Sequence, residues 1–315
     1  MTKVLVTGAT GNVGSRVIRD LMARDENVRA FVRDPGKAAG MFGGEQGGSV
    51  EIVPGDFSDA ASVSRALEGV DRVFLACAND PRQVEFETGV IDAAAAAGVR
   101  RIVKLSALGA GVGSSVAFWD WHGRIEEHLR ASGVPFVMLR PTFNMTNLLG
   151  SAEGVKHAGT LFAPAGGARV AMIDPKDVAA VAAVALTEDG HDGKTYTLTG
   201  PEAVTFERVA EELSAAVGRR IQFVSVPEEV ARQGMVEQGL PEFVAGQIVV
   251  VFGFLRRGAQ DRTTDAVREL TGREPRGLAR FFRDHARLFR HANDAGVDVL
   301  AGSGPERRKN EVIGA

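Results

Sequence analysis

Short apolar runs alternate with helical patterns through the first 140 residues of the chain. Residues 4–6 are a short apolar run, and the apolar positions of residues 13–22 then recur at helical spacing. Alternating strands and helices are typical of a parallel sheet with helices on both faces. The pattern predicts an α/β fold, a doubly wound parallel sheet of the Rossmann type. Further strands are predicted at 27–32, 50–53, 71–76, 101–106 and 135–139, helices at 60–67 and 84–97, and a long glycine-rich loop with at most a short helix at 36–48.

The turn between the first strand and the first helix carries three glycines at three-residue steps. Gly8 permits a tight turn, Gly11 lets the backbone approach a pyrophosphate, and Gly14 lets the helix pack closely on the strand. The helix N-terminus offers free N–H groups to phosphate charge. An ordinary strand-to-helix turn is the alternative, but a strand and a helix flank the glycines as a dinucleotide site requires. The predicted cofactor-binding residues of this loop are Gly8, Thr10, Gly11, Asn12, Val13 and Gly14.

The motif Thr-Gly-x-x-Gly-x-x-Gly at residues 7–14 resembles that of the extended and atypical short-chain dehydrogenase/reductases. The chain is most similar to the NmrA-like branch, which includes type 2 quinone oxidoreductases and azo and triphenylmethane-dye reductases. The resemblance covers nearly the whole chain and is specific mainly in this loop. It implies a nicotinamide dinucleotide as cofactor.

The alternating pattern breaks after residue 140 and returns for one helix at 174–186 and one short strand at 194–199. This order resembles the extended reductases, in which the chain leaves the nucleotide domain, returns once and leaves again. An amphipathic helix is predicted at 205–217. The predicted division is an NADP-binding domain of residues 1–140 and 174–199, a smaller C-terminal substrate domain of residues 141–173 and 200–292, and a mobile tail of residues 293–315.

The composition indicates a soluble globular protein, with 44% hydrophobic and 24% charged residues. The net charge of −3 gives no general attraction to nucleic acid or to an anionic membrane. No leader segment or membrane span is expected, and no metal site. Cys77 is the single cysteine, which fits a reducing, cytoplasmic compartment. The sequence does not determine the oligomeric state, and a homodimer is one of the alternatives that it leaves open.

The end of the second predicted strand indicates which nucleotide is bound. An acidic residue here would bond the ribose 2′-OH of NAD, whereas Arg33 stands at this position and Lys37 follows. A guanidinium suits a 2′-phosphate. Asp34 is an acidic residue next to this position and would favour NAD, but the adjacent Pro35 suggests a turn that points Asp34 outward. A solvated surface arginine is the alternative; the family resemblance, in which this position contacts the 2′-phosphate, favours NADP(H).

Two further pairs of residues follow predicted strands. Asp56 and Phe57 lie where members of the family contact adenine. Ala76 and Cys77 end the fourth strand and are expected to face the nicotinamide ribose, because ligands of such sheets lie at the carboxyl ends of the strands.

The Tyr-x-x-x-Lys motif of short-chain reductases is absent from the expected helix. Counting back from the following strand, Phe118 falls on the tyrosine position and His122 on the lysine position, and both lie on the apolar face of the helix. His122 is the predicted catalytic and cofactor-binding residue, passing a proton near neutral pH, with Glu126 orienting it or raising its pKa. Ser106, at the end of the fifth strand, is the second catalytic candidate. A buried histidine without a chemical role is the alternative.

The missing tyrosine bears on the substrate. Reduction of an ordinary ketone needs a strong proton donor at the developing alkoxide, whereas a quinone, azo compound or enone delocalises the incoming charge. The predicted function is hydride transfer from NADPH to a small conjugated acceptor. A non-catalytic NADP(H)-sensing regulator is the alternative, since NmrA-like proteins include both classes. The predicted substrate residues are Trp119, Phe143 and Asn144.

Overall fold

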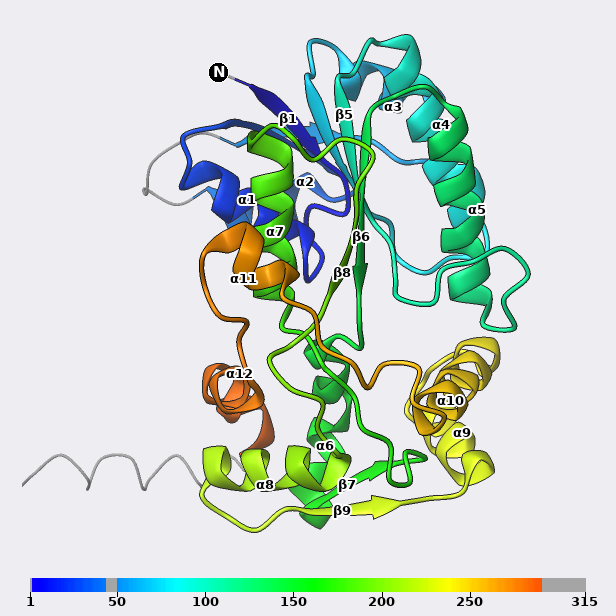
Figure 1. Cartoon of the computed structure of the whole chain (residues 1–315), viewed down its shortest axis with the longest axis vertical. Coiled ribbons are helices and arrows are strands. Elements are labelled where there is room, and N and C mark those ends of the chain that lie inside the picture. The colour runs from blue at the N-terminus through cyan, green and yellow to red at the C-terminus, as the bar shows by residue number, and fades with distance from the viewer. Residues whose placement is uncertain (1, 44–49, 291–315) are drawn as a thin grey trace, which may run out of the picture.

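Seven parallel strands form the main sheet of the protein in a computed structural model that describes residues 2–43 and 50–290 (Figure 1). All neighbouring strands run parallel, which confirms the predicted doubly wound sheet. The predicted strands are confirmed, with ends shifted by at most two residues. In sheet order the strands are β3 (Glu51–Pro54), β2 (Asn27–Val32), β1 (Lys3–Val6), β4 (Arg72–Leu75), β5 (Arg101–Leu105), β6 (Phe136–Pro141) and β8 (Thr195–Leu198).

Helices cover both faces of this sheet, because side chains alternate along each strand. Val4 and Val6 of β1 enter one apolar core, and Leu5 between them enters the other. The first core is covered by α1 (Gly14–Met22), α2 (Pro35–Phe42) and α7 (Pro175–Thr187). The second is covered by α3 (Ala60–Leu67), α4 (Gln83–Ala96) and α5 (Ala117–Ala131).

The segment predicted as a long loop at 36–48 begins with α2. Asp34 accepts a hydrogen bond from the backbone N–H of Lys37 at 3.0 Å, and Pro35 occupies the first helical turn. Asp34 therefore caps a helix and does not sit in an isolated turn. Residues 44–49 lie outside the described residues.

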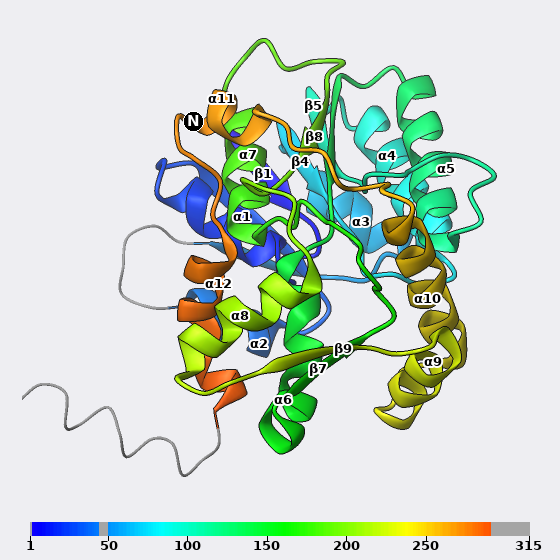
Figure 2. The same cartoon turned by 60° about the horizontal axis from the view of Figure 1, so that its bottom comes forward.

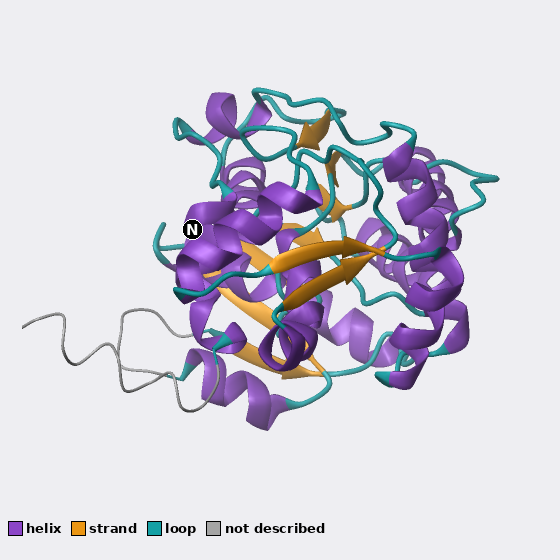
Figure 3. Cartoon of the chain, turned by 90° about the horizontal axis from the view of Figure 1, so that it is seen from below, coloured by secondary structure: helices purple, strands orange, loops and turns teal. Residues whose placement is uncertain are grey.

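A third apolar core lies below the main sheet and is built only from residues 145–172 and 204–289. A two-stranded parallel sheet, which the sequence did not predict, lies on this side of the molecule (Figure 2) and faces the viewer when the molecule is seen from below (Figure 3). The predicted helix at 205–217 is confirmed. The elements are η1 (Met145–Ser151), α6 (Ala152–Ala158), β7 (Thr160–Ala163), α8 (Phe206–Val217), β9 (Gln222–Ser225), α9 (Glu228–Glu237), α10 (Glu242–Arg256), α12 (Leu278–His285) and η2 (Ala286–Phe289).

One element departs from the predicted division of the chain. Helix α11 (Ala266–Thr271) falls in the segment assigned to the substrate domain, yet its Val267 is buried in the core shared with α1 and α7. Figure 1 shows α11 beside α7. The rest of the division stays a prediction, and its tail of residues 293–315 lies outside the described residues.

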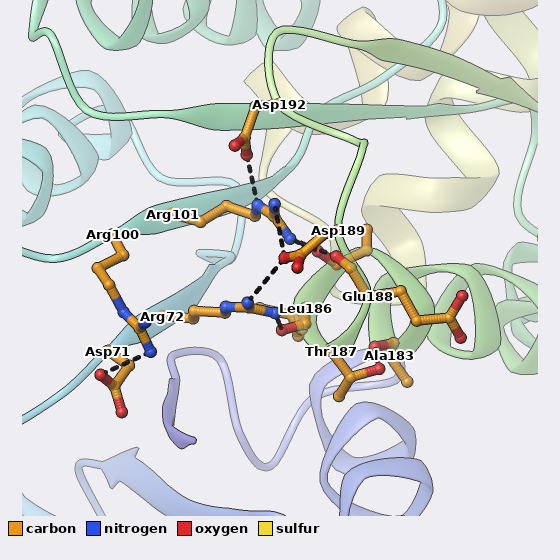
Figure 4. A network of polar contacts seen from close by, with 11 residues as sticks. Asp71, Arg72, Arg100, Arg101, Ala183, Leu186, Thr187, Glu188, Asp189 and Asp192 are labelled. Atoms are coloured by element: carbon orange, nitrogen blue, oxygen red, sulfur yellow. Dashed lines mark hydrogen bonds and ion pairs between the residues drawn. The ribbon is translucent and has the colours of Figure 1, made fainter. Parts of the chain in front are cut away.

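Arginines at the amino ends of β4 and β5 form hydrogen bonds and ion pairs with the end of α7 and the loop that follows it (Figure 4). Arg101 Nε lies 2.5 Å from Asp192 Oδ1, and the Arg101 guanidinium also donates to the carbonyl oxygens of Ala185, in the last turn of α7, and of Glu188, just after it. Arg72 lies 3.4 Å from Asp189. This network lies at the opposite end of the sheet from the glycine turn.

Candidate functional site

The glycine turn follows β1 at the carboxyl edge of the sheet. From here α1 crosses to one face, whereas α4, which follows the neighbouring strand β4, covers the other face. Such a switch point leaves a crevice in which open α/β sheets bind ligands. Gly8 has a φ of +59°, a conformation that favours glycine. A Cβ on Gly14 would lie 2.3 Å from the Gly8 carbonyl oxygen, so only glycine allows α1 to start this close to the turn.

Backbone donors at the start of α1 are available to a ligand. Gly11 N–H donates to Gly8 O at 2.9 Å, but the N–H groups of Asn12 and Val13 have no hydrogen-bond partner within residues 2–43 and 50–290. The Asn12 side chain lies 3.4 Å from the hydroxyl of Thr146 on η1. The turn can therefore bind an anionic group at a helix N-terminus, next to the third core.

Two cations lie beyond the end of β2. Arg33 and Lys37 are both exposed, and Asp34 between them is occupied in capping α2. Arg33 is close enough to Asp56, which follows β3, to help lower the pKa of that carboxyl, although hydrogen bonds from Ser58 are the main cause. This corner has the positive charge that a 2′-phosphate requires.

Phe57 belongs to an aromatic group at the same corner. Its ring stacks on Phe86 with centroids 6.0 Å apart and meets Phe31 edge-on at 5.6 Å. The Arg82 guanidinium lies over the ring of Phe86, 4.6 Å from its centroid. The predicted adenine contact thus lies within an aromatic and cationic surface, which the sequence did not reveal beyond Phe57.

Ala76 and Cys77 directly follow β4, which ends at Leu75, one residue before the predicted end of this strand. The hydroxyl of Thr7 accepts from Ala76 N–H at 2.8 Å and fastens the glycine turn to this strand end. Burial, with a smaller effect from Glu87, raises the pKa of the Cys77 thiol to about 12. The thiol is therefore protonated at neutral pH and is no nucleophile.

His122 lies on α5, and its ring contacts a lysine side chain. Nδ1 of His122 lies 3.2 Å from Nζ of Lys104, on β5. Burial, and then the charge of Lys104, holds the pKa of His122 well below its ordinary value. The expectation that His122 passes a proton near neutral pH is therefore wrong; the side chain is a neutral imidazole. Its assignment as a catalytic and cofactor-binding residue stays a prediction.

Lys104 and Glu87 form a fully buried ion pair that the sequence analysis missed. Nζ lies 2.7 Å from Glu87 Oε2, and Gln83 Nε2 donates to Glu87 Oε1 at 2.8 Å. Lys104 follows Ile102 on the face covered by α4 and α5, so the alternation along β5 was the available signal.

Glu126 does not orient His122, which corrects the second expectation for this helix. The carboxylate is buried and accepts from Arg140 Nε at 2.9 Å and from Arg130 at 2.8 Å. Ser106 Oγ donates to Glu126 Oε1 at 2.6 Å. The Ser106 hydroxyl proton is thus committed within the protein, and the catalytic role assigned to Ser106 stays a prediction.

The three predicted substrate residues lie in packed or capping positions. Trp119 is buried against Phe254 of α10, with ring centroids 5.0 Å apart. Phe143 packs on Phe206 in the third core, and Asn144 caps η1. Their contact with a substrate stays a prediction.

An aromatic group between α5 and α10 was not predicted as a unit. Trp121 stacks on Phe243, with centroids 6.1 Å apart, and Phe118 meets both rings edge-on. Phe243 is 50% exposed. These rings form an aromatic group between the start of α5 and α10.

Two kinds of feature are missing from the described part of the chain. No helix there is long and apolar enough to cross a bilayer. Nor do those residues contain a cluster of three or more His, Cys, Asp or Glu side chains placed to hold a metal ion.

Comparisons with known proteins agree with this geometry. The NmrA-like family matches residues 1–282. The chain is 35% identical to NAD(P)H azoreductase of Xenophilus azovorans, over 91% of this chain and 99% of that protein. It is 39% identical to (4-alkanoyl-5-oxo-2,5-dihydrofuran-3-yl)methyl phosphate reductase of Streptomyces griseus, with the same two coverages. The solved NADPH complex of an NADPH-dependent quinone oxidoreductase from Escherichia coli aligns with a TM-score of 0.79 and 30% identity, over 90% of this chain and 99% of that one. The chain belongs to the NmrA-like family.

Proposed function

We propose that this protein is an NADPH-dependent oxidoreductase that reduces a small conjugated acceptor, such as a quinone, an azo compound or an enone. One observation carries the choice of acceptor: α5 presents Phe118, which has no proton to donate, and the neutral His122, while the nearby ammonium of Lys104 is buried in an ion pair with Glu87. Relatives named as an azoreductase and a quinone oxidoreductase support the same class.

The residues at the carboxyl edge fit a dinucleotide phosphate. The unpartnered N–H groups of Asn12 and Val13 suit the pyrophosphate, and the absence of a side chain on Gly14 leaves the turn tight enough to present them. Arg33 and Lys37 supply the charge for a 2′-phosphate. NADPH, when bound here, supplies the hydride.

The side chains around the nicotinamide end favour acceptors that need little proton donation. The Ser106 hydroxyl donates to Glu126, and the Cys77 thiol, with a pKa of about 12, is a weak acid. The neutral His122 can donate a hydrogen bond but holds no readily released proton. A ketone would need such a proton at its developing alkoxide, whereas a quinone or enone spreads the charge over its conjugated system.

The aromatic group of Phe118, Trp121 and Phe243 supports a flat acceptor. Trp121 and Phe243 already lie nearly parallel, with an interplanar angle of 25°. Aromatic faces attract other planar rings by offset stacking. A cytoplasmic location, a homodimer and the absence of a nucleic-acid partner stay predictions from the sequence.

The test is a calorimetric titration with NADPH, followed by steady-state assays of quinones, azo dyes, enones and simple ketones. We expect saturable binding and turnover that is fastest with the conjugated acceptors. Absence of saturable binding at sub-millimolar NADPH would contradict the cofactor assignment. Binding without turnover of any acceptor would favour the alternative of a nucleotide-sensing regulator.

A further inference from the structure

The ammonium group of Lys104 lies among three acceptors at the carboxyl end of β5. Its Nζ lies 2.7 Å from Glu87 Oε2 and 3.2 Å from His122 Nδ1, and it donates to the carbonyl oxygen of Leu105. The side chains of Lys104 and Glu87 are fully buried. A lysine ammonium has three N–H donors and no acceptor; here it forms hydrogen bonds with Leu105 O and His122 Nδ1 and an ion pair with Glu87.

This arrangement determines which ring nitrogen of His122 carries the proton. Because the ammonium can only donate, Nδ1 of His122 must accept. A neutral imidazole has one accepting and one donating nitrogen, so Nε2 carries the hydrogen. Within residues 2–43 and 50–290 no protein group forms a hydrogen bond with Nε2, and His122 keeps part of its surface exposed.

We propose that Lys104 is a positioning residue that holds His122 as a neutral imidazole and presents its Nε2–H to an oxygen of the bound nicotinamide riboside. The identity of that ligand rests on the proposed function. The tautomer itself follows from the contacts within the protein. In this arrangement His122 is a fixed hydrogen-bond donor. The buried ion pair of Lys104 and Glu87 keeps the hydrogen on Nε2 and holds the ring in one orientation.

The charges around His122 are consistent with a neutral ring. Lys104 faces it from β5, and Glu87 on α4 is balanced by that lysine. On its own helix, Glu126 is neutralised by Arg140. No uncompensated carboxylate in the described residues therefore stabilises an imidazolium, and Lys104 opposes one.

The first test is nitrogen-15 NMR of the whole protein labelled at histidine, using two-bond proton–nitrogen correlations. The chain has six histidines, and the His122→Gln variant identifies the resonances of interest. We expect an unprotonated Nδ1 and a protonated Nε2 at neutral pH. An Nδ1–H tautomer, or an imidazolium at neutral pH, would overturn the proposal.

The second test removes the ion pair as a unit. The double variant Lys104→Met/Glu87→Gln leaves no unpaired buried charge. We expect mixed tautomers of His122, a higher protonation midpoint and a Kd for NADPH raised about three- to ten-fold, the range of one hydrogen bond. The matched control, Arg101→Met/Asp192→Asn, removes an ion pair at the far end of β5 and should change neither the tautomer nor the Kd.

The two tests separate this proposal from the proposed function. An unchanged tautomer in the folded double variant would overturn the role of Lys104, whatever the enzyme binds. Failure of the wild-type protein to bind NADPH would overturn the proposed function, and the assignment of the riboside as the ligand with it. The nitrogen-15 spectrum would then still decide whether Lys104 sets the tautomer.

Discussion

A Cβ atom on Gly14 would lie 2.3 Å from the carbonyl oxygen of Gly8, well inside the distance at which non-bonded atoms meet. The neighbour is backbone, so it cannot rotate away. Because Gly14 has no side chain, the start of α1 can lie directly against the phosphate-facing turn.

The Gly14→Ala substitution should separate these two segments. We expect the free energy of unfolding to fall by about 1–3 kcal/mol, as for overpacking, and NADPH binding to be lost or strongly weakened. Chemical denaturation and a calorimetric titration measure the two effects. Gly89→Ala is the control, because Gly89 is an exposed helical glycine with nothing within 4 Å of the added atom. This control should gain up to about 1 kcal/mol and bind NADPH normally. Equal behaviour of the two variants would contradict the account.

Arg33→Ala should separate NADPH from NADH. The exposed guanidinium has no ion-pair partner in the described residues and is free to meet the 2′-phosphate. Loss of one charge-assisted contact of about 1.5–3 kcal/mol raises the Kd for NADPH about ten- to a hundred-fold and leaves that for NADH nearly unchanged. Arg100→Ala removes the same charge at the amino end of β5 and serves as the control. Equal losses for both nucleotides with Arg33→Ala would show that Arg33 does not contact the phosphate.

The main sheet was predictable because its signal is local. In β1 each residue of the run Val4-Leu5-Val6 meets an apolar core on one face or the other, so the run is continuously apolar. The glycine turn was predictable for the same reason, since three glycines act within seven residues. The small sheet was not, because β7 and β9 have four residues each and expose Phe162 and Val224, which hides any alternation.

The candidate site was less predictable than the sheet because its polar groups pair across distant segments. Glu87 and Lys104 belong to different elements, and nothing in either segment alone indicates that both are buried. Glu126 lies one turn from His122, so proximity along the helix suggested a pair. Arg140, on the neighbouring strand β6, binds the Glu126 carboxylate instead. Tertiary packing thus decided both partners.

Asp177 should make stability depend on pH. Burial is the main cause that raises its pKa from 3.8 to about 6. The folded state binds this proton more tightly than the unfolded state, so the group stabilises the fold below pH 3.8. That contribution is lost as the pH rises through about 6. The stability of Asp177→Asn relative to wild type should therefore grow by up to about 3 kcal/mol between about pH 4 and about pH 7.

Urea denaturation at several pH values measures this difference. Asparagine can still accept the hydrogen bond that Arg276 N–H donates to Asp177 at 2.7 Å, so the substitution isolates the charge. Asp189→Asn, at a side chain 92% exposed, is the control and should show no comparable trend. A pH-independent difference for Asp177→Asn would contradict the prediction.

The Cys77 thiol should be unreactive in the folded protein. Its pKa of about 12 leaves almost no thiolate at pH values used for alkylation. We expect iodoacetamide to modify it at least about a hundred-fold more slowly than in the urea-unfolded protein. Mass spectrometry follows this reaction cleanly, since the chain has one cysteine. Similar rates in the two states would show that the thiol is exposed and ionised.

Single-turnover oxidation of NADPH tests the central claim most directly. The protein is loaded with NADPH or its 4-deuterated form and mixed with a quinone, an enone or a simple ketone. The account predicts rapid oxidation with the conjugated acceptors, slowed by deuterium, and little or none with the ketone. Equally fast oxidation by the ketone, or bound NADPH that no acceptor oxidises, would contradict it.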